Sequence, residues 1–160
     1  MSDNGTKKCS IVVFSGDMDK VMGAFIIATT AAAMDMETSM FFTFWGLQAV
    51  KKKGIRTGKG LFGKMLGFMF ADIDGIGPSK MNFGGMGRWM FKKMMKDQNV
   101  TSLPALRQMA IELGITLLPC KMSMDVMEIA PDDLIDEMED PVGAATYVLE
   151  AQEADITLFV

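Results

Sequence analysis

The chain of 160 residues has the length of one ordinary domain, and 49% of its residues are apolar, so it can bury a full core and is not expected to be disordered. Its net charge of −4 is mild and gives no reason to expect a nucleic-acid partner. The sequence contains no histidine, which excludes Ser-His-Asp hydrolysis, Cys-His proteases and histidine-based zinc or haem sites.

The first part of the chain alternates between predicted strands and helices. Two short apolar, β-branched runs, 8–14 and 38–44, are typical of buried strands. Each is followed by apolar residues at helical spacing, which predicts helices over 18–34 and 47–53. Asp17 or Asp19 is expected to cap the first helix. This βαβα order predicts an α/β fold with a parallel sheet.

The alternation stops at residues 54–99, which we call the Gly/Met-rich segment. It holds ten of the sixteen glycines and seven of the eighteen methionines, and short helices are predicted at 61–70 and 86–95. Residues 51–96 carry eleven Lys or Arg against two Asp. A connection this long inside a domain is usually functional or partly disordered.

The alternation then returns. Thr101 or Ser102 is expected to cap a helix that ends at Gly114. A strand is then predicted over 115–118 and a helix over 121–127. An acidic connection, 131–140, leads to a last helix, 141–151, and a last strand, 156–160. The pattern therefore gives four strands, with a fifth conceivable in the Gly/Met-rich segment or near Met127.

Cys120 is the leading candidate for chemistry because it follows Pro119 at the end of a predicted strand. Function collects beyond the carboxyl ends of strands in open α/β sheets. The helix after Cys120 would direct backbone N–H groups and its positive dipole end toward the sulfur, and Lys121 would add a cation. These effects favour the nucleophilic thiolate, so we expect Cys120 to be exposed with a depressed pKa.

Cys9 lies inside the first predicted strand and is interpreted as a core residue. In a parallel sheet it would lie roughly 15 Å along the strand direction from Cys120, so no disulfide is expected. Two cysteines are too few for a secreted disulfide scaffold, and residues 1–14 do not form a signal peptide. We therefore expect a cytoplasmic protein.

Six other residues are candidates for a substrate pocket around Cys120. Gly16 and Asp17 follow the first strand, where related folds bind phosphate, although a carboxylate would repel phosphate and a plain helix cap is the competing interpretation. Trp45 and Gly46 end the second strand, where the indole could wall the thiol pocket or pack in the core. Lys121 and Ser123 follow the cysteine directly. No metal ligands and no cofactor are predicted.

The Gly/Met-rich segment is the candidate for an interface. Its apolar residues and lysines would suit a contact between subunits of a homo-oligomer, or peripheral contact with a membrane surface. The acidic stretch from Glu128 to Asp140 is interpreted as a solvated face, or as a surface that meets the basic segment of a neighbouring subunit.

The run ITLLPCKMSMDVM that ends at Met127, together with CSIVVFSGDMDKVMGAFIIATTAAAMD and FFTFWGL, resembles the DsrE-like sulfur-relay family over essentially the whole chain. The resemblance is to the branch with a long Gly/Met-rich insertion, here about 54–100. It implies a single domain, 1–160, with a three-layer α/β/α fold and a mostly parallel sheet of four to five strands. It also implies that Cys120 carries sulfane sulfur as a persulfide.

The predicted function is thus that of a sulfur carrier or sulfurtransferase-like protein, with sulfur donor and acceptor proteins or small thiols as partners. The residues after Cys120 differ from the small and basic ones of the better-studied family members, so partner specificity does not transfer. The alternative is a non-catalytic binding module that docks a redox or sulfur-metabolism partner through the Gly/Met-rich segment. A thiol-redox enzyme is disfavoured because there is no CxxC motif.

Overall fold

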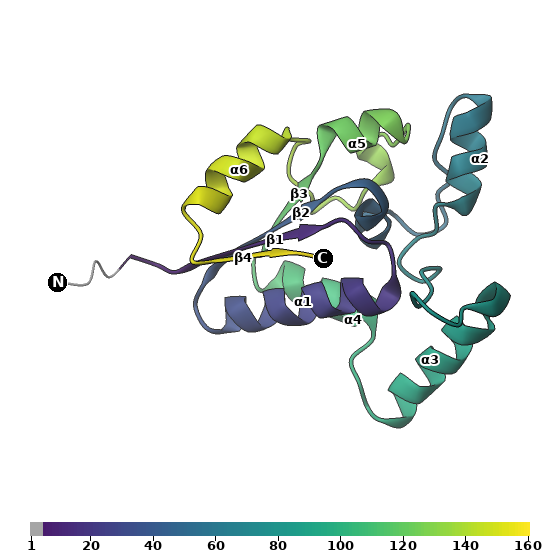
Figure 1. The fold of residues 1–160 in the computed structure, drawn as a ribbon, viewed down its shortest axis with the longest axis horizontal. Helices are drawn as coiled ribbons and strands as arrows, with labels where there is room; N and C mark the ends of the chain where they lie inside the picture. Colours follow the sequence, from purple (N-terminus) through teal and green to yellow (C-terminus); the bar gives the residue numbers. More distant parts are fainter. Residues whose placement is uncertain (1–4) are drawn as a thin grey trace.

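The computed structural model describes residues 5–160 and has a parallel sheet between two helical layers (Figure 1). The strands lie in the order β3-β2-β1-β4 and are β1 (Lys8–Val13), β2 (Glu37–Phe42), β3 (Thr116–Pro119) and β4 (Ile156–Phe159). One face is covered by α1 (Met18–Ala33) and α4 (Leu103–Glu112), and the other by α5 (Lys121–Val126) and α6 (Ala144–Gln152). The predicted α/β/α fold is confirmed, with four strands in the sheet of the described residues.

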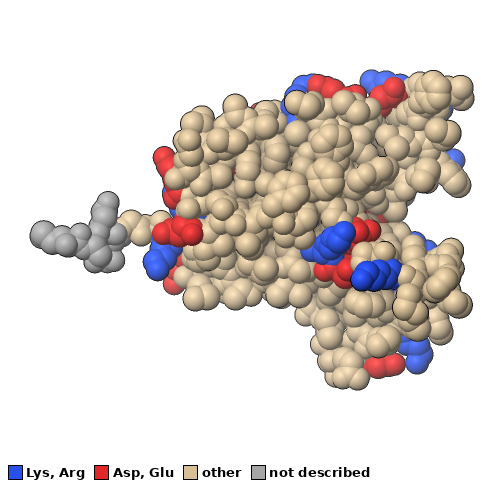
Figure 2. Space-filling view, in the orientation of Figure 1, with Lys and Arg blue, Asp and Glu red and all other residues tan. Residues whose placement is uncertain are grey.

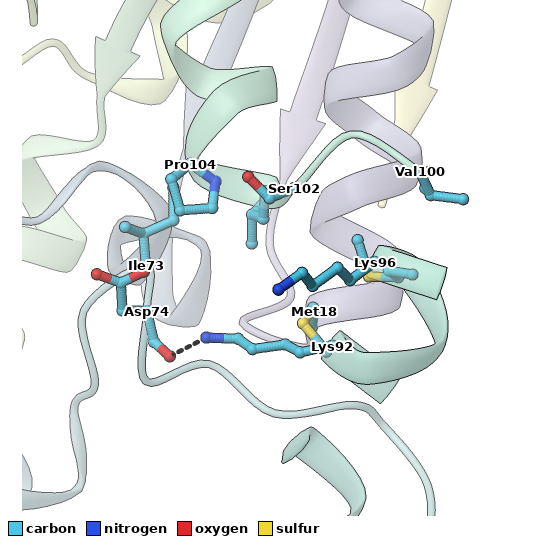
Figure 3. A pocket seen from close by; sticks show the side chains of 10 residues that line it. Met18, Ile73, Asp74, Lys92, Lys96, Val100, Ser102 and Pro104 are labelled. Atoms are coloured by element: carbon cyan, nitrogen blue, oxygen red, sulfur yellow. Dashed lines mark hydrogen bonds between the residues drawn. The ribbon is translucent and has the colours of Figure 1, made fainter. Parts of the chain in front are cut away.

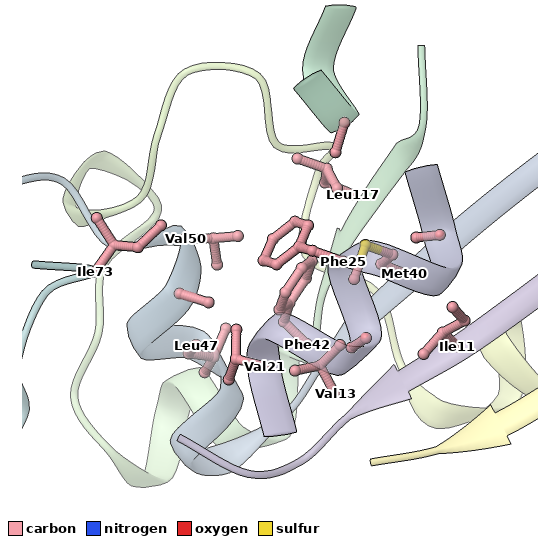
Figure 4. Packing of buried hydrophobic residues seen from close by; sticks show 14 of the residues in the cluster. Ile11, Val13, Val21, Phe25, Met40, Phe42, Leu47, Val50, Ile73 and Leu117 are labelled. Carbon is pink, nitrogen blue, oxygen red and sulfur yellow. The ribbon is translucent and has the colours of Figure 1, made fainter. Parts of the chain in front are cut away.

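Apolar residues on both faces of the strands explain why this sheet is buried. Alternate strand residues face α1 and α4, among them Ile11, Val13, Met40, Phe42 and Leu117 (Figure 4). Their neighbours Val12, Phe41 and Leu118 face the opposite helical layer. Phe25 of α1 packs on Phe42, with ring centroids 6.1 Å apart. Strands covered on both sides read as continuous apolar runs rather than as alternating ones.

The chain after β2 differs from the prediction. The predicted strand 38–44 ends at Phe42, and the predicted helix 47–53 is replaced by a 3-10 helix, η1 (Phe44–Val50). Phe44 has a positive φ of 46°, and the Gly46 N–H donates to the carbonyls of Phe14 and Thr43, both at 3.0 Å. The backbone therefore turns tightly beside the end of β1 instead of opening an α-helix.

The last helix also begins later than predicted, at Ala144. Val142 is extended because it forms a bridge with Cys120: its N–H donates to the Pro119 carbonyl at 3.0 Å, and its own carbonyl accepts from the Lys121 N–H at 2.9 Å. These bonds hold residues 140–142 against the end of β3. Helical backbone there would break them.

The Gly/Met-rich segment forms the two predicted helices, α2 (Leu61–Met69) and α3 (Met86–Asp97), with a short 3-10 turn, η2 (Phe83–Gly85), before α3. It is anchored on the first turn of α1. The Met18 N–H donates to the Gly77 carbonyl at 2.8 Å, and the Asp19 carboxylate accepts from the N–H and hydroxyl of Ser79, both at 2.7 Å. Asp19 is thus an anchor and not a helix cap.

Part of the acidic stretch binds basic or N–H groups of the same chain. Glu128 accepts hydrogen bonds from the Lys59 and Gly60 N–H groups just before α2, and Asp136 pairs with Lys52 at 2.7 Å. The Glu128 bonds lower the pKa of its carboxyl. Both carboxylates therefore have partners within the chain.

Candidate functional site

Cys120 lies at the carboxyl end of β3 and is the residue from which α5 begins. Its N–H donates to the Phe42 carbonyl at 2.9 Å, and its own carbonyl accepts from the Met124 N–H at 3.0 Å. Val142 forms the bridge on its other side. The backbone of Cys120 is therefore held by β2, by α5 and by the segment before α6, which fixes the direction of its side chain.

The expectation that Cys120 is exposed is wrong. The residue is only 6% exposed and packs with Val12, Phe41 and Leu118 on the sheet face beneath α6. Val142 and Tyr147 complete this cluster, and the Tyr147 ring stacks on Phe41 with centroids 5.0 Å apart. The strand ends where the sequence predicts, but the segment that contains Val142 and Tyr147 folds over this end.

The surroundings of the sulfur nevertheless favour the thiolate. Burial by itself would raise the pKa of Cys120, but hydrogen bonds from the hydroxyls of Ser123 and Thr43 and from the N–H groups of Ser123 and Met122 hold the pKa below its usual value. The two hydroxyl oxygens lie 2.7 Å apart and both residues are buried, so one hydroxyl donates to the other and the second is free to donate its proton to the sulfur. Two backbone amides at the start of α5 and two hydroxyls thus form a polar cradle inside an otherwise apolar cluster.

Lys121, expected to add a cation, does not face the sulfur. Its ammonium pairs with the Asp125 carboxylate one turn along α5. An ion pair at spacing i,i+4 is a common local arrangement on a helix, and both side chains are exposed. The groups that lower the pKa of Cys120 are instead neutral hydroxyls and amides.

Thr43 is the functional group that sequence reasoning missed. The sequence placed it inside a predicted strand, with nothing to distinguish it from a packing residue. Phe42 pairs with Pro119, so Thr43 stands level with Cys120 on the neighbouring strand path. The two residues come together because β2 lies beside β3 in the sheet. Local sequence patterns do not predict this strand order.

The structure brings the loops that carry the other candidates to the same edge of the sheet as Cys120, and Trp45 among them is exposed. A side chain at Gly16 would meet the Trp45 carbonyl at 2.8 Å, and one at Gly46 would meet the Val13 carbonyl at 2.0 Å. Both glycines therefore allow close backbone contact. Asp17 stands at the cap position of α1 without accepting a helix N–H, and pairs with Lys20 at 2.8 Å. The Trp45 ring lies beside Phe70, with centroids 6.2 Å apart.

Cys9 is a core residue in a different part of the sheet. It is 1% exposed, and burial raises the pKa of its thiol. The register places it about five residues along the strands and two strands across from Cys120, roughly 19 Å at ordinary strand spacings. Both thiols are free. No group of three or more Cys, Asp or Glu side chains within residues 5–160 is arranged to hold a metal ion.

Comparison with known proteins places the chain in a family. The model of the DsrE/DsrF/DrsH-like family matches residues 5–159. The chain is 46% identical over 157 residues to the uncharacterized protein YrkE of Bacillus subtilis, covering 97% of this chain and 98% of that one. It is 34% identical over 157 residues to the sulfur carrier protein DsrE2 of Allochromatium vinosum, covering 96% and 98%.

The fold is also that of a solved structure. The ychN protein from E. coli superposes with a TM-score of 0.56 at 12% identity, over 97% of this chain and all of that one, which shows a shared fold. The family match over nearly the whole chain and the 34% identity to a DsrE2 protein agree with this fold. The chain is therefore a member of the DsrE/DsrF/DrsH-like family.

Proposed function

We propose that this protein is a sulfur carrier that holds sulfane sulfur as a persulfide on Cys120 and passes it to an acceptor thiol. The polar cradle of Thr43, Ser123 and the first amides of α5 is the observation that carries the proposal, because it favours an anionic sulfur in a buried position. Family membership and the similarity to a sulfur carrier support a role in sulfur relay.

The proposed transfer needs no change in overall oxidation state. The Cys120 thiolate attacks the outer sulfur of a donor persulfide, a new S–S bond forms, and the donor S–S bond breaks so that the donor leaves as a thiolate. The terminal sulfur on Cys120 is then attacked by an acceptor thiolate, and Cys120 leaves with its electron pair. Cys9 lies too far away to resolve the persulfide into a disulfide.

Access to the buried thiol requires that its cover move. The cover consists of Val142 and Tyr147, and α6, which carries Tyr147, has no buried residue of its own. The Glu150 carboxylate on the same helix has one buried oxygen without a hydrogen-bond partner. Helices with few buried apolar contacts open at low free energy, so α6 is the proposed gate for donor and acceptor.

Mass spectrometry of the intact protein tests the proposal. After incubation with polysulfide, the wild-type protein should gain the mass of one sulfur atom, and a reductant or a small acceptor thiol should remove it. Cys120→Ser should gain none, while Cys9→Ser, the matched control, should load normally. If Cys120→Ser takes up reductant-labile sulfur to the wild-type level, the carrier proposal is wrong.

The non-catalytic binding module remains the second candidate because the Gly/Met-rich segment exposes large apolar side chains. On α2 and α3 these include Leu61, Phe62, Phe68 and Trp89, which are 82%, 78%, 80% and 65% exposed. Such a surface is typical of a protein contact. A Cys120 thiol that titrates like an ordinary cysteine and takes up no sulfur would favour this function over the carrier.

The same surface predicts a homo-oligomer. We expect light scattering at micromolar concentration to give a multiple of the 17.5 kDa chain mass, because burial of these side chains between subunits removes them from water. The double substitution Phe62→Ser, Phe68→Ser should shift the assembly toward monomer. In Figure 2 charged side chains are also sparse over α6, β4 and α1, and Ile27, Leu149 and Phe159 of these elements are exposed, so more than one apolar surface is open to a second copy.

A wild-type monomer would contradict the oligomer and leave peripheral binding to an anionic membrane as the use of this surface. Flotation with anionic and with neutral liposomes tests that alternative, because the exposed basic residues of 51–96, such as Arg56, Lys59 and Lys64, should bind only the anionic ones. Of the helices described, none has the length and apolarity needed to cross a bilayer.

Two free thiols persist best in a reducing compartment, so we place the carrier in the cytoplasm.

A further inference from the structure

A cavity of about 450 Å³ lies where α3 meets the first turns of α1 and α4 (Figure 3). Its apolar wall is formed by Met18, Ile73, Met95, Val100, Leu103 and Pro104. Met18 belongs to the core cluster on the α1 and α4 side of the sheet, whereas Cys120 belongs to the cluster on the opposite side. The cavity is therefore separate from the thiol, and its volume falls within the range of about 300–1,000 Å³ found for small-molecule sites.

Two lysines of α3 extend into this cavity. Lys92 and Lys96 are one helical turn apart, and Figure 3 shows both side chains reaching across the cavity toward the chain at Ile73 and Asp74. The Lys92 ammonium donates to the Asp74 carbonyl at 2.7 Å. Ion pairs among residues 5–160 involve other lysines, namely Lys8, Lys20, Lys52, Lys53, Lys93 and Lys121.

The carboxylate of the cavity lining is already engaged. Asp74, the acidic residue of the lining, pairs with Lys53 at 2.7 Å. Like charges at spacing i,i+4 disfavour a helix slightly, and within residues 5–160 neither Lys92 nor Lys96 has a carboxylate partner, although both are exposed. The amino end of α4, capped by Ser102, also borders the cavity and adds its positive dipole end.

The combination of walls and charges restricts the ligand. An inorganic anion would leave the apolar wall in contact with water, and a neutral apolar molecule would gain nothing from the two ammonium groups, which are exposed at the edge of the cavity. A molecule with an anionic head and an apolar body satisfies both parts of the cavity.

We propose that this cavity binds a small organic anion of the class of medium-chain carboxylates. Its carboxylate lies between the ammonium groups of Lys92 and Lys96, and its apolar body lies against Met18 and Leu103. The site is independent of the sulfur chemistry proposed for Cys120, because it is on the other side of the sheet.

Octanoate is the probe, and the methionine methyl groups of the protein give a local readout. In wild-type protein with labelled methionine methyl groups, octanoate should shift the NMR signals of Met18 and Met95 in a saturable way. Met65 and Met69, which are exposed on α2, report binding elsewhere and should not shift. Octanol, which has the same chain without the charge, should bind at least about tenfold more weakly.

Substitutions on α3 separate the proposed site from general charge effects. Lys96→Met should weaken octanoate binding about tenfold, since it removes one charge and keeps an apolar chain. Lys93→Met is the matched control: Lys93 neighbours Lys92 on α3 but pairs with Asp97 at 3.4 Å, and the substitution should leave binding unchanged. Val100→Trp places a larger side chain at the edge of the cavity, at a position that is 47% exposed, and should weaken binding without unfolding the protein.

Several results would overturn the proposal. Absence of saturable shifts at Met18 and Met95 would do so, as would equal affinity for octanol. Equal weakening by Lys93→Met and Lys96→Met would show that only net charge matters. Unchanged octanoate binding in Val100→Trp would place the ligand outside this cavity.

Discussion

Cys120 is expected to react with iodoacetamide at neutral pH at least about a hundredfold faster than Cys9. Cys9 lies in β1, in the interior of the sheet, and becomes accessible only when the sheet opens. Cys120 needs only the movement of α6, which carries Tyr147. The pKa of Cys120 is lowered while that of Cys9 is raised, so the thiolate fraction favours Cys120 as well. Peptide mapping after timed alkylation measures both rates.

The pH dependence of this reaction tests the cradle itself. Alkylation of Cys120 should rise with pH around a midpoint below the value of about 8.5 for an ordinary thiol, because its hydrogen bonds stabilise the thiolate. Ser123→Ala removes one hydroxyl of the cradle and should move the midpoint upward and slow the reaction at neutral pH. Reaction at Cys9 as fast as at Cys120, or an unchanged midpoint in Ser123→Ala, would contradict the site assignment.

Gly46→Ala is expected to destabilise the protein by about 3 kcal/mol or more, or to prevent folding. A β-carbon at this position would lie 2.0 Å from the Val13 carbonyl oxygen and 2.7 Å from its carbonyl carbon. These are backbone atoms at the end of β1, and that strand is fixed between β2 and β4. The clash can be relieved only by moving β1 or η1. Urea denaturation followed by circular dichroism measures the loss.

Gly23→Ala is the control for this substitution. Gly23 lies inside α1, and a β-carbon there has no heavy atom within 4 Å outside its own surroundings in the helix. Alanine should therefore stabilise the protein by about 0.5–1 kcal/mol through its higher helix propensity. Equal loss of stability in Gly23→Ala and Gly46→Ala would show that the close approach of Gly46 to β1 is not the cause.

Regular elements with strong local patterns were predictable from this sequence. The continuous apolar runs of β1 and β2 identify strands buried on both faces, and α2 and α3 begin where predicted. The failures occur where distant backbone determines the local conformation. The Gly46 N–H donates to the Phe14 carbonyl just after β1, and Val142 forms backbone hydrogen bonds with Pro119 and Lys121. Neither residue therefore adopts the helical backbone that its neighbours favour.

The candidate site was predictable only in part. The place of Cys120 at the start of a helix follows from Pro119 and the helical spacing after it. Thr43 depends on strand order, and the cover over the thiol depends on how α6 returns to the sheet, so neither has a local signal. The pairing of Lys121 with Asp125 could have been anticipated from their spacing of four residues.

The pairing of β1 with β4 has a consequence for synthesis on the ribosome. β1 and β4 are adjacent in the sheet but are separated by most of the chain, as the Cys9–Ile156 pairing shows. At roughly 5–20 residues per second, a nascent β1 waits on the order of ten seconds for its partner. During that time one edge of β1 offers unpaired N–H and carbonyl groups to any other exposed strand. On a ribosome that stalls before β4 is made, this edge of β1 would stay unpaired and prone to aggregation. Chaperone binding should therefore be strongest at that stage of translation.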